Sequence, residues 1–376
     1  MSAASHAFRL GTLLRLAASL ALVATTIGCQ TASYYSQAVR GQFALWSRQK
    51  PIDDLLKANG TPRELKERLE LVMELRRFAG QQLKLPTDGH YLKYADLQRR
   101  YVVWNVYAAP EFSLTPKSWW YPVVGSLDYR GYFSESKARA HAGRLKEEGF
   151  DVYVGGVTAY STLGWFRDPV LNTFLFDSDA ELGELIFHEL AHQRLFIRGD
   201  TEFNEAFATA VAEEGTRRWM ESRGDSAALA EYRQQARRTS EFVALVSETR
   251  SRLETLFASA TNQVMSPASA DDLRARKQRL LDGMTSRYSE LRRHWGNGGE
   301  YDMWFNRALN NAQLNTVDTY YRLVPRFRSV LTNCNGDLEH FYQAVGRLDG
   351  LSHQERRERL DSLASPHATH AAAERR

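Results

Sequence analysis

The sequence predicts an α+β fold in which a small lobe with a mixed sheet is followed by a mainly helical lobe. Runs rich in Val, Trp and Tyr fall between about residues 95 and 177, whereas the chain after residue 178 shows only the apolar spacing of helices. This separation of strands from helices along the chain is typical of α+β proteins. The 376 residues can bury a substantial core, as one large domain or two coupled lobes.

The first 28 residues have the features of a secretion signal. Arg9 and Arg15 flank the start of an apolar stretch, residues 16–27, that is too short to anchor stably across a bilayer. The stretch ends in a small residue followed by Cys29, which resembles a bacterial lipobox, so we expect cleavage before Cys29 and lipidation of its thiol. An ordinary cleaved signal and an uncleaved anchor are the alternatives, and each places the protein outside the cytoplasm.

The residues around the leader also indicate a location. Gln30 favours the outer membrane, because Asp at that position would resemble an inner-membrane retention signal. We therefore expect an outer-membrane lipoprotein on the periplasmic side of the cell envelope. Cys334 is the second of two cysteines, and a lipidated Cys29 leaves it without a disulfide partner. Without the leader, 47 Lys and Arg face 45 acidic residues, which excludes the basic stripe of a nucleic-acid binder.

The elements before residue 178 follow from local patterns. Residues 29–50 are expected to form a membrane tether whose aromatic side chains pack onto the body. Thr61-Pro62-Arg63-Glu64 predicts a helix that begins with Pro in its first position and a capping box, and that runs to about Gly80. Ser134 caps a short helix to about Glu148. The expected strands and extended segments are 101–107, 119–124, 150–157, 160–165 and 171–176.

The elements after residue 178 are all expected to be helices. Ser178 and Glu181 have the spacing of a capping box and begin a helix near residue 179. Gly199 supplies a stop and Asp200 or Thr201 a new cap, which predicts a helical hairpin with its turn near 198–200. The remaining helices are expected at 201–222, 226–258, 269–294, 303–314, 316–324, 336–348 and 353–363. The charged region 233–293 is interpreted as a solvated helical face, or alternatively as a wall of the cleft.

The sequence His188-Glu189-Leu190-Ala191-His192 lies inside the first helix of this hairpin. Residues four apart on a helix share a face, so both imidazoles can reach one metal, and Glu189 beside them can hold a metal-bound water. His192 lies about 9 Å before the turn and Glu205 about 7.5 Å after it, so one ion could bridge the hairpin. Two His and one Glu form a catalytic zinc set with an open fourth position, and we expect one Zn²⁺ per chain. A solvated surface His pair is the alternative, although apolar neighbours surround the motif.

The motif also carries a resemblance. His188-Glu189-x-x-His192 followed by Asn204-Glu205-Ala206-Phe207-Ala208 resembles the gluzincin metallopeptidases, and segments 34–42, 159–166 and 310–312 resemble the predicted aminopeptidase family of bacterial lipoproteins over about residues 29–350. This resemblance implies a zincin-like fold, zinc ligands His188, His192 and Glu205, and Glu189 as catalytic acid and base. Two departures from better-known gluzincin aminopeptidases are the twelve residues between His192 and Glu205, which is a shorter spacing, and the lack of a Gly-x-Met-Glu-Asn amine-binding segment.

Two kinds of supporting residue are expected near the metal, each with a core or surface role as its alternative. Thr209 and Glu213 lie one and two turns beyond Glu205 and are candidates to orient the ligands. The resemblance further implies a downstream donor to the oxyanion of the transition state. The candidates for this donor are Tyr320 and Tyr321, and beyond them Tyr301 and His294.

The substrate itself needs two further contacts. In gluzincins an edge strand before the zinc helix pairs with the substrate backbone, which would place Tyr160 and Ser161 near the cleft. An aminopeptidase also needs an acid that captures the free amine of the peptide. The sequence offers Asp168, Glu181 and Glu184 and does not choose among them.

The sequence is consistent with three functions. The first is a zinc aminopeptidase acting on peptides, in which Glu189 activates a zinc-bound water. The second is a zinc endopeptidase or amidase acting on cell-envelope proteins or peptidoglycan peptides. The third is a non-catalytic lipoprotein that keeps a peptidase-like fold. The four intact residues of the motif disfavour the third, and the sequence leaves the oligomeric state open.

The expected domain organisation combines these elements. A signal peptide (1–28) and a tether (29–50) precede a zinc peptidase domain (51–364), and a disordered tail (365–376) follows. Within the domain, the sheet-containing part covers about 95–177, the zinc helices about 178–222 and the helical part about 225–364.

Overall fold

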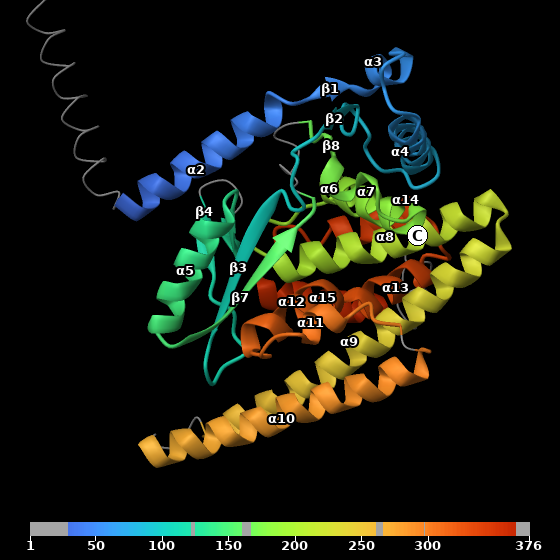
Figure 1. The fold of residues 1–376 in the computed structure, drawn as a ribbon. Helices are drawn as coiled ribbons and strands as arrows, with labels where there is room; N and C mark the ends of the chain where they lie inside the picture. The colour runs from blue at the N-terminus through green and yellow to red at the C-terminus, as the bar shows by residue number, and fades with distance from the viewer. Residues whose placement is uncertain (1–28, 122–124, 160–166, 261–265, 297, 366–376) are drawn as a thin grey trace, which may run out of the picture.

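The computed structural model describes residues 29–121, 125–159, 167–260, 266–296 and 298–365. The predicted signal peptide, the extended segment 160–165, residues 123–124 and the tail beyond Ser365 lie outside them. Figure 1 shows a small sheet at one side of the molecule and helices over the rest. The structure is thus mixed α and β with a helical majority, and the predicted α+β class is confirmed at this level.

The central sheet has three strands in the order β6-β3-β7. β3 (Val103–Pro110) pairs antiparallel with both β6 (Arg130–Tyr132) and β7 (Phe150–Val157), in a register that sets Val103 opposite Val157 and Pro110 opposite Phe150. α5 (Glu135–Glu147) covers one face of this sheet and α12 (Asn311–Tyr321) contacts both of its longer strands. The Ser134 hydroxyl accepts a hydrogen bond from the Lys137 amide at the start of α5, so the predicted cap is confirmed.

Two smaller sheets complete the strand content of the described residues. One joins β1 (Lys50–Pro51), β2 (Lys93–Ala95) and β8 (Val170–Leu171), with an antiparallel and a parallel pair. The other is the pair of β4 (Trp119–Tyr121) and β5 (Gly125–Leu127). The predicted strand 171–176 is wrong beyond its first residue, because Asn172–Leu175 forms the short helix α6. The Asn172 side chain accepts from the Leu97 amide and donates to the Arg99 carbonyl, and these tertiary bonds override the local β propensity.

The segment before the sheets is more regular than expected. Residues expected to form only a tether form the helix α2 (Cys29–Trp46), and the short helix α3 (Ile52–Lys57) follows. The predicted helix near 61–80 is confirmed as α4 (Arg63–Gln81). Its predicted capping box does not form, because Pro62 occupies the cap position and supplies no side-chain bond.

The four long helices after residue 178 follow the prediction closely. They are α7 (Asp179–Arg194), α8 (Thr201–Arg223), α9 (Ser226–Ala260) and α10 (Pro267–His294). α14 (Leu338–Gly346) and α15 (His353–Ala364) also agree with it. Among the described residues, none of the helices is long and apolar enough to cross a membrane.

The helices predicted at 303–314 and 316–324 are wrong. The chain instead forms the single turn α11 (Asp302–Phe305), the helix α12 and then α13 (Val324–Asn333). The reason lies at Asn310, whose side chain accepts from the Gln313 amide and begins α12 in the middle of the predicted helix. Asn311 next to it is fully buried, and its side-chain amide donates to three backbone carbonyls at the end of β3 and just after it, those of Pro110, Glu111 and Ser113.

The main core surrounds α8, which lies between α7 and α13. The side chains of Phe203, Phe207 and Trp219 on α8 are almost completely buried. A second cluster joins α9, α10 and α12, and a third lies between the sheet and α5. α7 and α8, which carry the sequence motif, are therefore held inside the molecule and not on a mobile edge.

Replacement of Asn311 by Ala should destabilise the protein by about 2–4 kcal/mol, because it leaves buried carbonyl groups without their donor. Urea denaturation measures the loss. The exposed Asn306, five residues earlier, supplies the control Asn306→Ala, which should change stability by less than about 0.5 kcal/mol. Equal stabilities of the two variants would contradict the anchoring role of Asn311.

Candidate active site

The start of α7 is fixed by local bonds. The Ser178 hydroxyl accepts from the Glu181 amide while the Glu181 carboxylate accepts from the Ser178 amide, so the predicted capping box is confirmed. The helix then runs without interruption to Arg194. Gly199, at φ +80°, does not end α7 as predicted but turns the chain just before α8, in a left-handed conformation that favours glycine.

Residues at the start of α8 fix the turn between α7 and α8. Asp200 caps the helix by accepting from the Phe203 amide, and it is buried in an ion pair with Arg356 of α15. The Asn204 side chain makes two bonds to Ile197, accepting from its amide at 2.8 Å and donating to its carbonyl at 2.7 Å. These bonds hold the first turn of α8 against the end of α7 and so determine where Glu205 points.

A glycine lets the two helices approach closely. A Cβ atom on Gly215 of α8 would lie 3.0 Å from the Phe187 ring of α7 and 2.6 Å from the Leu83 side chain. Both distances are shorter than ordinary carbon contacts, so a larger residue would push the helices apart. The helix packing therefore holds the two halves of the motif within reach of each other.

Three ligand-type atoms converge between the helices. His188 Nε2 lies 3.1 Å from Glu205 Oε2 and 3.1 Å from His192 Nε2, and His192 Nε2 lies 3.6 Å from Glu205 Oε2. Tetrahedral zinc holds its ligands at roughly 2.0–2.1 Å, which separates neighbouring ligand atoms by about 3.3 Å. The donor set and its spacing thus fit one zinc ion, as the sequence predicted for His188, His192 and Glu205.

The charges of the three groups are strongly coupled. Burial alone would raise the pKa of Glu205, but the charges and hydrogen bonds of His192 and His188 outweigh it and hold the pKa well below its ordinary value. Burial would likewise lower the pKa of His192, whereas the Glu205 carboxylate raises it above the ordinary value. Glu205 is therefore held in its ionised form beside the two imidazoles.

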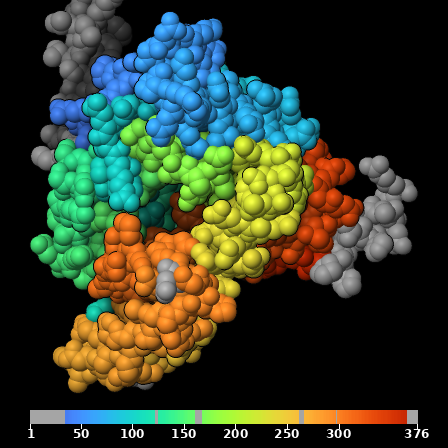
Figure 2. All heavy atoms as spheres, turned by 45° about the vertical axis from the view of Figure 1, so that its right-hand side comes forward, coloured from blue at the N-terminus to red at the C-terminus, as the bar shows by residue number. Residues whose placement is uncertain are grey.

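A cleft of about 1100 Å³ opens over His188 and Glu189. Its walls come from α7, α8, the first part of α9 and the end of α12, and Figure 2 shows it as a hollow bordered by green, yellow and orange segments. Part of the charged region lines the cleft, as the alternative interpretation expected, through Gln234, Gln235, Ala236, Arg238 and Thr239 of α9. Further along, α9 packs on α10. The motif is therefore accessible to a substrate-sized molecule.

The two tyrosines predicted as oxyanion donors differ in their contacts with the motif. The ring of Tyr320 stacks on His188, with ring centres 6.0 Å apart, and burial together with the nearby Glu205 raises its pKa well above the ordinary value. Tyr321 lines the same cleft, and its pKa is raised by burial and by Glu213 and Glu184. Of the two tyrosines, Tyr320 is the one whose ring stacks on an imidazole of the motif.

The other two candidates of this kind belong elsewhere. Tyr301 donates to the Thr239 hydroxyl and stacks on Phe242, inside the cluster that joins α9 and α10. His294 is the last residue of α10. The contacts of Tyr301 make it part of the packing between α9 and α10.

The predicted supporting residues differ in the contacts that they make. Thr209 and Glu213 both line the cleft, but the Glu213 carboxylate is bound by Arg328 and not by an imidazole. His192 Nδ1 is buried and has no hydrogen-bond partner among the described residues, so no orienting group for it is assigned there. Tyr160 and Ser161 lie outside the described residues.

The structure distinguishes the three candidates for the amine-binding acid. Asp168 is buried beside His90, at 3.7 Å from its ring nitrogen, and Glu181 is occupied in the capping box. Glu184 lines the cleft one turn before His188, and its carboxylate accepts a hydrogen bond of 2.8 Å from the Tyr232 hydroxyl of α9. Burial, partly offset by this bond, raises the pKa of Glu184 to about 7.

Sequence patterns missed several tyrosines of the site. Tyr232 comes from α9, and Tyr91 and Tyr107 come from a loop and from β3. Burial raises the pKa values of Tyr91 and Tyr107, with further contributions from Glu189 and Glu205 respectively. Tyr107 lies in a predicted strand, but nothing local to these residues indicates that they face α7 and α8. They meet the motif only through tertiary packing.

Comparison with known proteins gives one family. A family model described as "putative aminopeptidase" matches residues 33–360. No curated protein and no solved structure gives a match.

Replacement of Asn204 by Ala should lower the free energy of unfolding by about 2–4 kcal/mol, because both of its bonds to Ile197 are buried. Thermal or urea denaturation measures this loss, with Gln278→Ala on the exposed face of α10 as the control. The variant should also bind added zinc more weakly, since Glu205 is the next residue. Wild-type stability with wild-type metal affinity would show that the bonds of Asn204 do not position Glu205.

Proposed function

This chain belongs to the putative aminopeptidase family, and from that premise we propose that it is a zinc-dependent aminopeptidase. Membership of the family supports peptidase activity in general. The finer assignment rests on the site geometry, foremost on the position of Glu184 beside the converging ligand atoms. Zinc dependence, mechanism and cleavage at the amino terminus are each part of the proposal.

We propose that His188, His192 and Glu205 hold one Zn²⁺. Three protein ligands leave one position of a tetrahedral ion for water or substrate, which distinguishes catalytic from structural zinc sites. When bound, the ion supplies a Lewis acid that acidifies water and polarises the peptide carbonyl. The cleft opens on His188, so that a peptide can reach this position from solvent.

Glu189 is the proposed general base and acid. Its carboxylate lines the same cleft one residue after His188, and it contributes to the electrostatics of His192, Tyr91 and Tyr320. In the proposed reaction Glu189 accepts a proton from the attacking water and then donates it to the departing amine. The Tyr320 hydroxyl, whose raised pKa keeps its proton, donates a hydrogen bond to the oxyanion that forms.

Glu184 is the proposed anchor for the substrate's amino group. It precedes His188 by one helical turn on the same face of α7, a rise of about 6 Å. A peptide residue spans about 3.5 Å, so an amine held at Glu184 leaves room for only about one or two residues before the motif. The bond from Tyr232 holds the carboxylate at the cleft wall. This arrangement favours removal of one amino-terminal residue over cleavage within a long chain.

We also propose that the mature chain is a lipoprotein on the periplasmic side of the envelope, attached through Cys29. The sequence features before Cys29 support this, and Cys334, the other cysteine, is a free thiol in the structure. Incorporation of labelled fatty acid that is lost in Cys29→Ser tests the attachment. Labelling that persists in the variant would contradict it.

The metal and the base can be tested together. Purified protein should contain about one zinc per chain, and Glu189→Gln should retain the metal while losing activity by about 10²- to 10⁴-fold, because only the proton transfer is removed. Metal analysis and hydrolysis of unblocked peptides measure the two effects. Glu231→Gln, an exposed acid of the same cleft, is the control.

The ligand residues give a separate test. Adding zinc to metal-free protein should raise the melting temperature, since a ligand at about 100 times its Kd stabilises a protein by about 2.7 kcal/mol. His192→Ala and Glu205→Ala should abolish this shift. Undiminished hydrolysis by Glu189→Gln, or by protein depleted of metal, would falsify the mechanism.

The role of Glu184 predicts a pH dependence. Below about pH 7 the carboxyl group carries a proton and attracts an amine weakly, whereas above it the group is negative while an α-amino group, with a pKa near 8, is still charged. The ratio of kcat/KM for free over acetylated peptides should therefore rise between about pH 6 and 7.5. Glu184→Gln should flatten this rise and increase KM for free peptides, while Glu231→Gln should keep it. Equal cleavage of free and acetylated peptides by the wild type would favour the endopeptidase or amidase alternative.

A further inference from the structure

An apolar stripe is exposed along α2. Val39 and Phe43 are each 68% exposed, Tyr35 is 44% exposed and Trp46 is 41% exposed. Their spacing of four, four and three residues places these side chains on one face of the helix. Large apolar residues that gather on one exposed face, rather than being scattered, indicate a surface that contacts something other than water.

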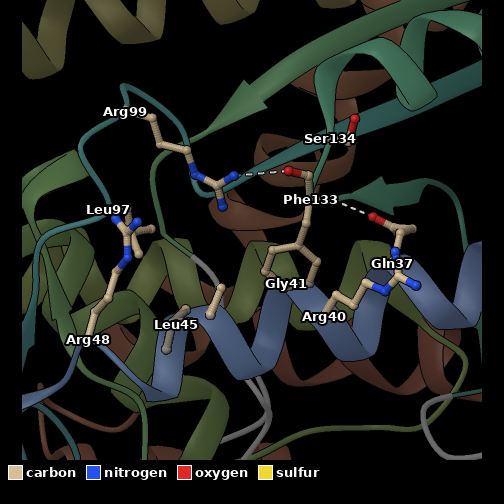
Figure 3. A pocket seen from close by; sticks show the side chains of 10 residues that line it. Gln37, Arg40, Gly41, Leu45, Arg48, Leu97, Arg99, Phe133 and Ser134 are labelled. Atoms are coloured by element: carbon tan, nitrogen blue, oxygen red, sulfur yellow. Dashed lines mark hydrogen bonds between the residues drawn. The ribbon is translucent and has the colours of Figure 1, made fainter.

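The opposite face of α2 is fixed to the body, as Figure 3 shows. The Gln37 side chain accepts from the Phe133 amide at 2.8 Å, and Arg99 donates to the Phe133 carbonyl. The Phe133 ring lies directly over Gly41, where a Cβ atom would come within 2.1 Å of it, and Leu45 is buried. These contacts determine the rotation of the helix, so the stripe of Tyr35, Val39, Phe43 and Trp46 faces outward.

The charge around the stripe is positive. Residues 29–52 contain no acidic residue and include the exposed residues Arg40, Arg48 and Lys50, of which Arg48 donates to the Asp96 carbonyl of the body. Two exposed acids, Asp53 and Asp54, follow at the start of α3, so the net charge of residues 29–54 is positive. None of these three forms an ion pair with a carboxylate of the described residues. A helix with an apolar face rich in aromatic residues and unneutralised basic residues beside it matches the interface of an anionic bilayer.

The place of α2 in the chain supports the same partner. The helix begins at Cys29, directly after the apolar stretch 16–27 and at the proposed lipid attachment point. Figure 1 shows α2 along the outside of the molecule. Its 18 residues, about 27 Å long, would lie flat at the surface and not cross the bilayer.

We propose that the outer face of α2 binds the surface of an anionic membrane and holds the body against it in one orientation. The stripe inserts between headgroups while the exposed Arg40 and Lys50 contact lipid phosphates. This surface is distinct from the cleft, and the proposal does not depend on peptidase activity. A second copy of the chain covering the stripe is the competing occupant.

The test uses the chain from residue 29 with Cys29→Ser, which keeps every other described residue but cannot be acylated. It should sediment with vesicles of phosphatidylglycerol and phosphatidylethanolamine, and bind several-fold less to phosphatidylcholine alone. Val39→Glu with Phe43→Glu should weaken binding by about tenfold or more. Ser286→Glu with Ser289→Glu on exposed α10, far from α2 in Figure 1, makes the same charge change and should bind like the parent.

Three outcomes would overturn the proposal. They are absence of binding to anionic vesicles, equal loss in both double variants, and a concentration-dependent dimer that the α2 variant abolishes in sedimentation without lipid. Hydrolysis of soluble peptides by each variant is measured in parallel. Because α2 lies outside the cleft, the two proposals can fail separately. Normal hydrolysis without membrane binding would contradict only the proposal for α2. Absence of hydrolysis in the parent would contradict only the proposed function.

Discussion

The packing of α7 against α8 is the constraint on which the candidate site depends. It sets a buried carboxylate, Glu205, beside two imidazoles in an interior of Leu and Phe side chains, where an uncompensated charge would cost several kcal/mol. Gly215 permits the close approach, and the bonds of Asn204 set the starting point of α8. The ligand cluster is therefore a product of helix packing and not of a flexible loop.

α7 also sets the spacing of the other residues of the candidate site. Glu184, His188 and His192 recur at intervals of one turn along a single face, and Glu189 lies beside the central member. Two of them receive a partner from another helix: Tyr232 of α9 bonds Glu184, and Tyr320 of α12 stacks on His188. In the proposed function, α7 thus sets the distance between Glu184, which binds the substrate amine, and the metal ligands. The neighbouring helices supply the tyrosines that contact Glu184 and His188.

The two proposed surfaces lie on separate elements. The cleft is formed by α7, α8, α9 and α12, whereas the exposed stripe lies on α2. The contacts of Gln37 and Phe133 connect α2 to the chain just before α5, and α5 covers the central sheet. A membrane contact through α2 would therefore leave the helices of the cleft unconstrained while fixing the body to which they belong.

The sequence by itself determined what depends on neighbours a few residues apart: the spacing of His188 and His192 on one face, the capping box at Ser178, and the Asp200 cap that begins α8. It also indicated Glu205 from the length of the turn. Tertiary structure alone decided which acid bonds Tyr232 at the cleft wall, which tyrosine stacks on His188, and where Asn310 and Asn311 restart a helix. Those choices depend on contacts between residues far apart in the chain, such as Glu184 with Tyr232, for which no local pattern exists.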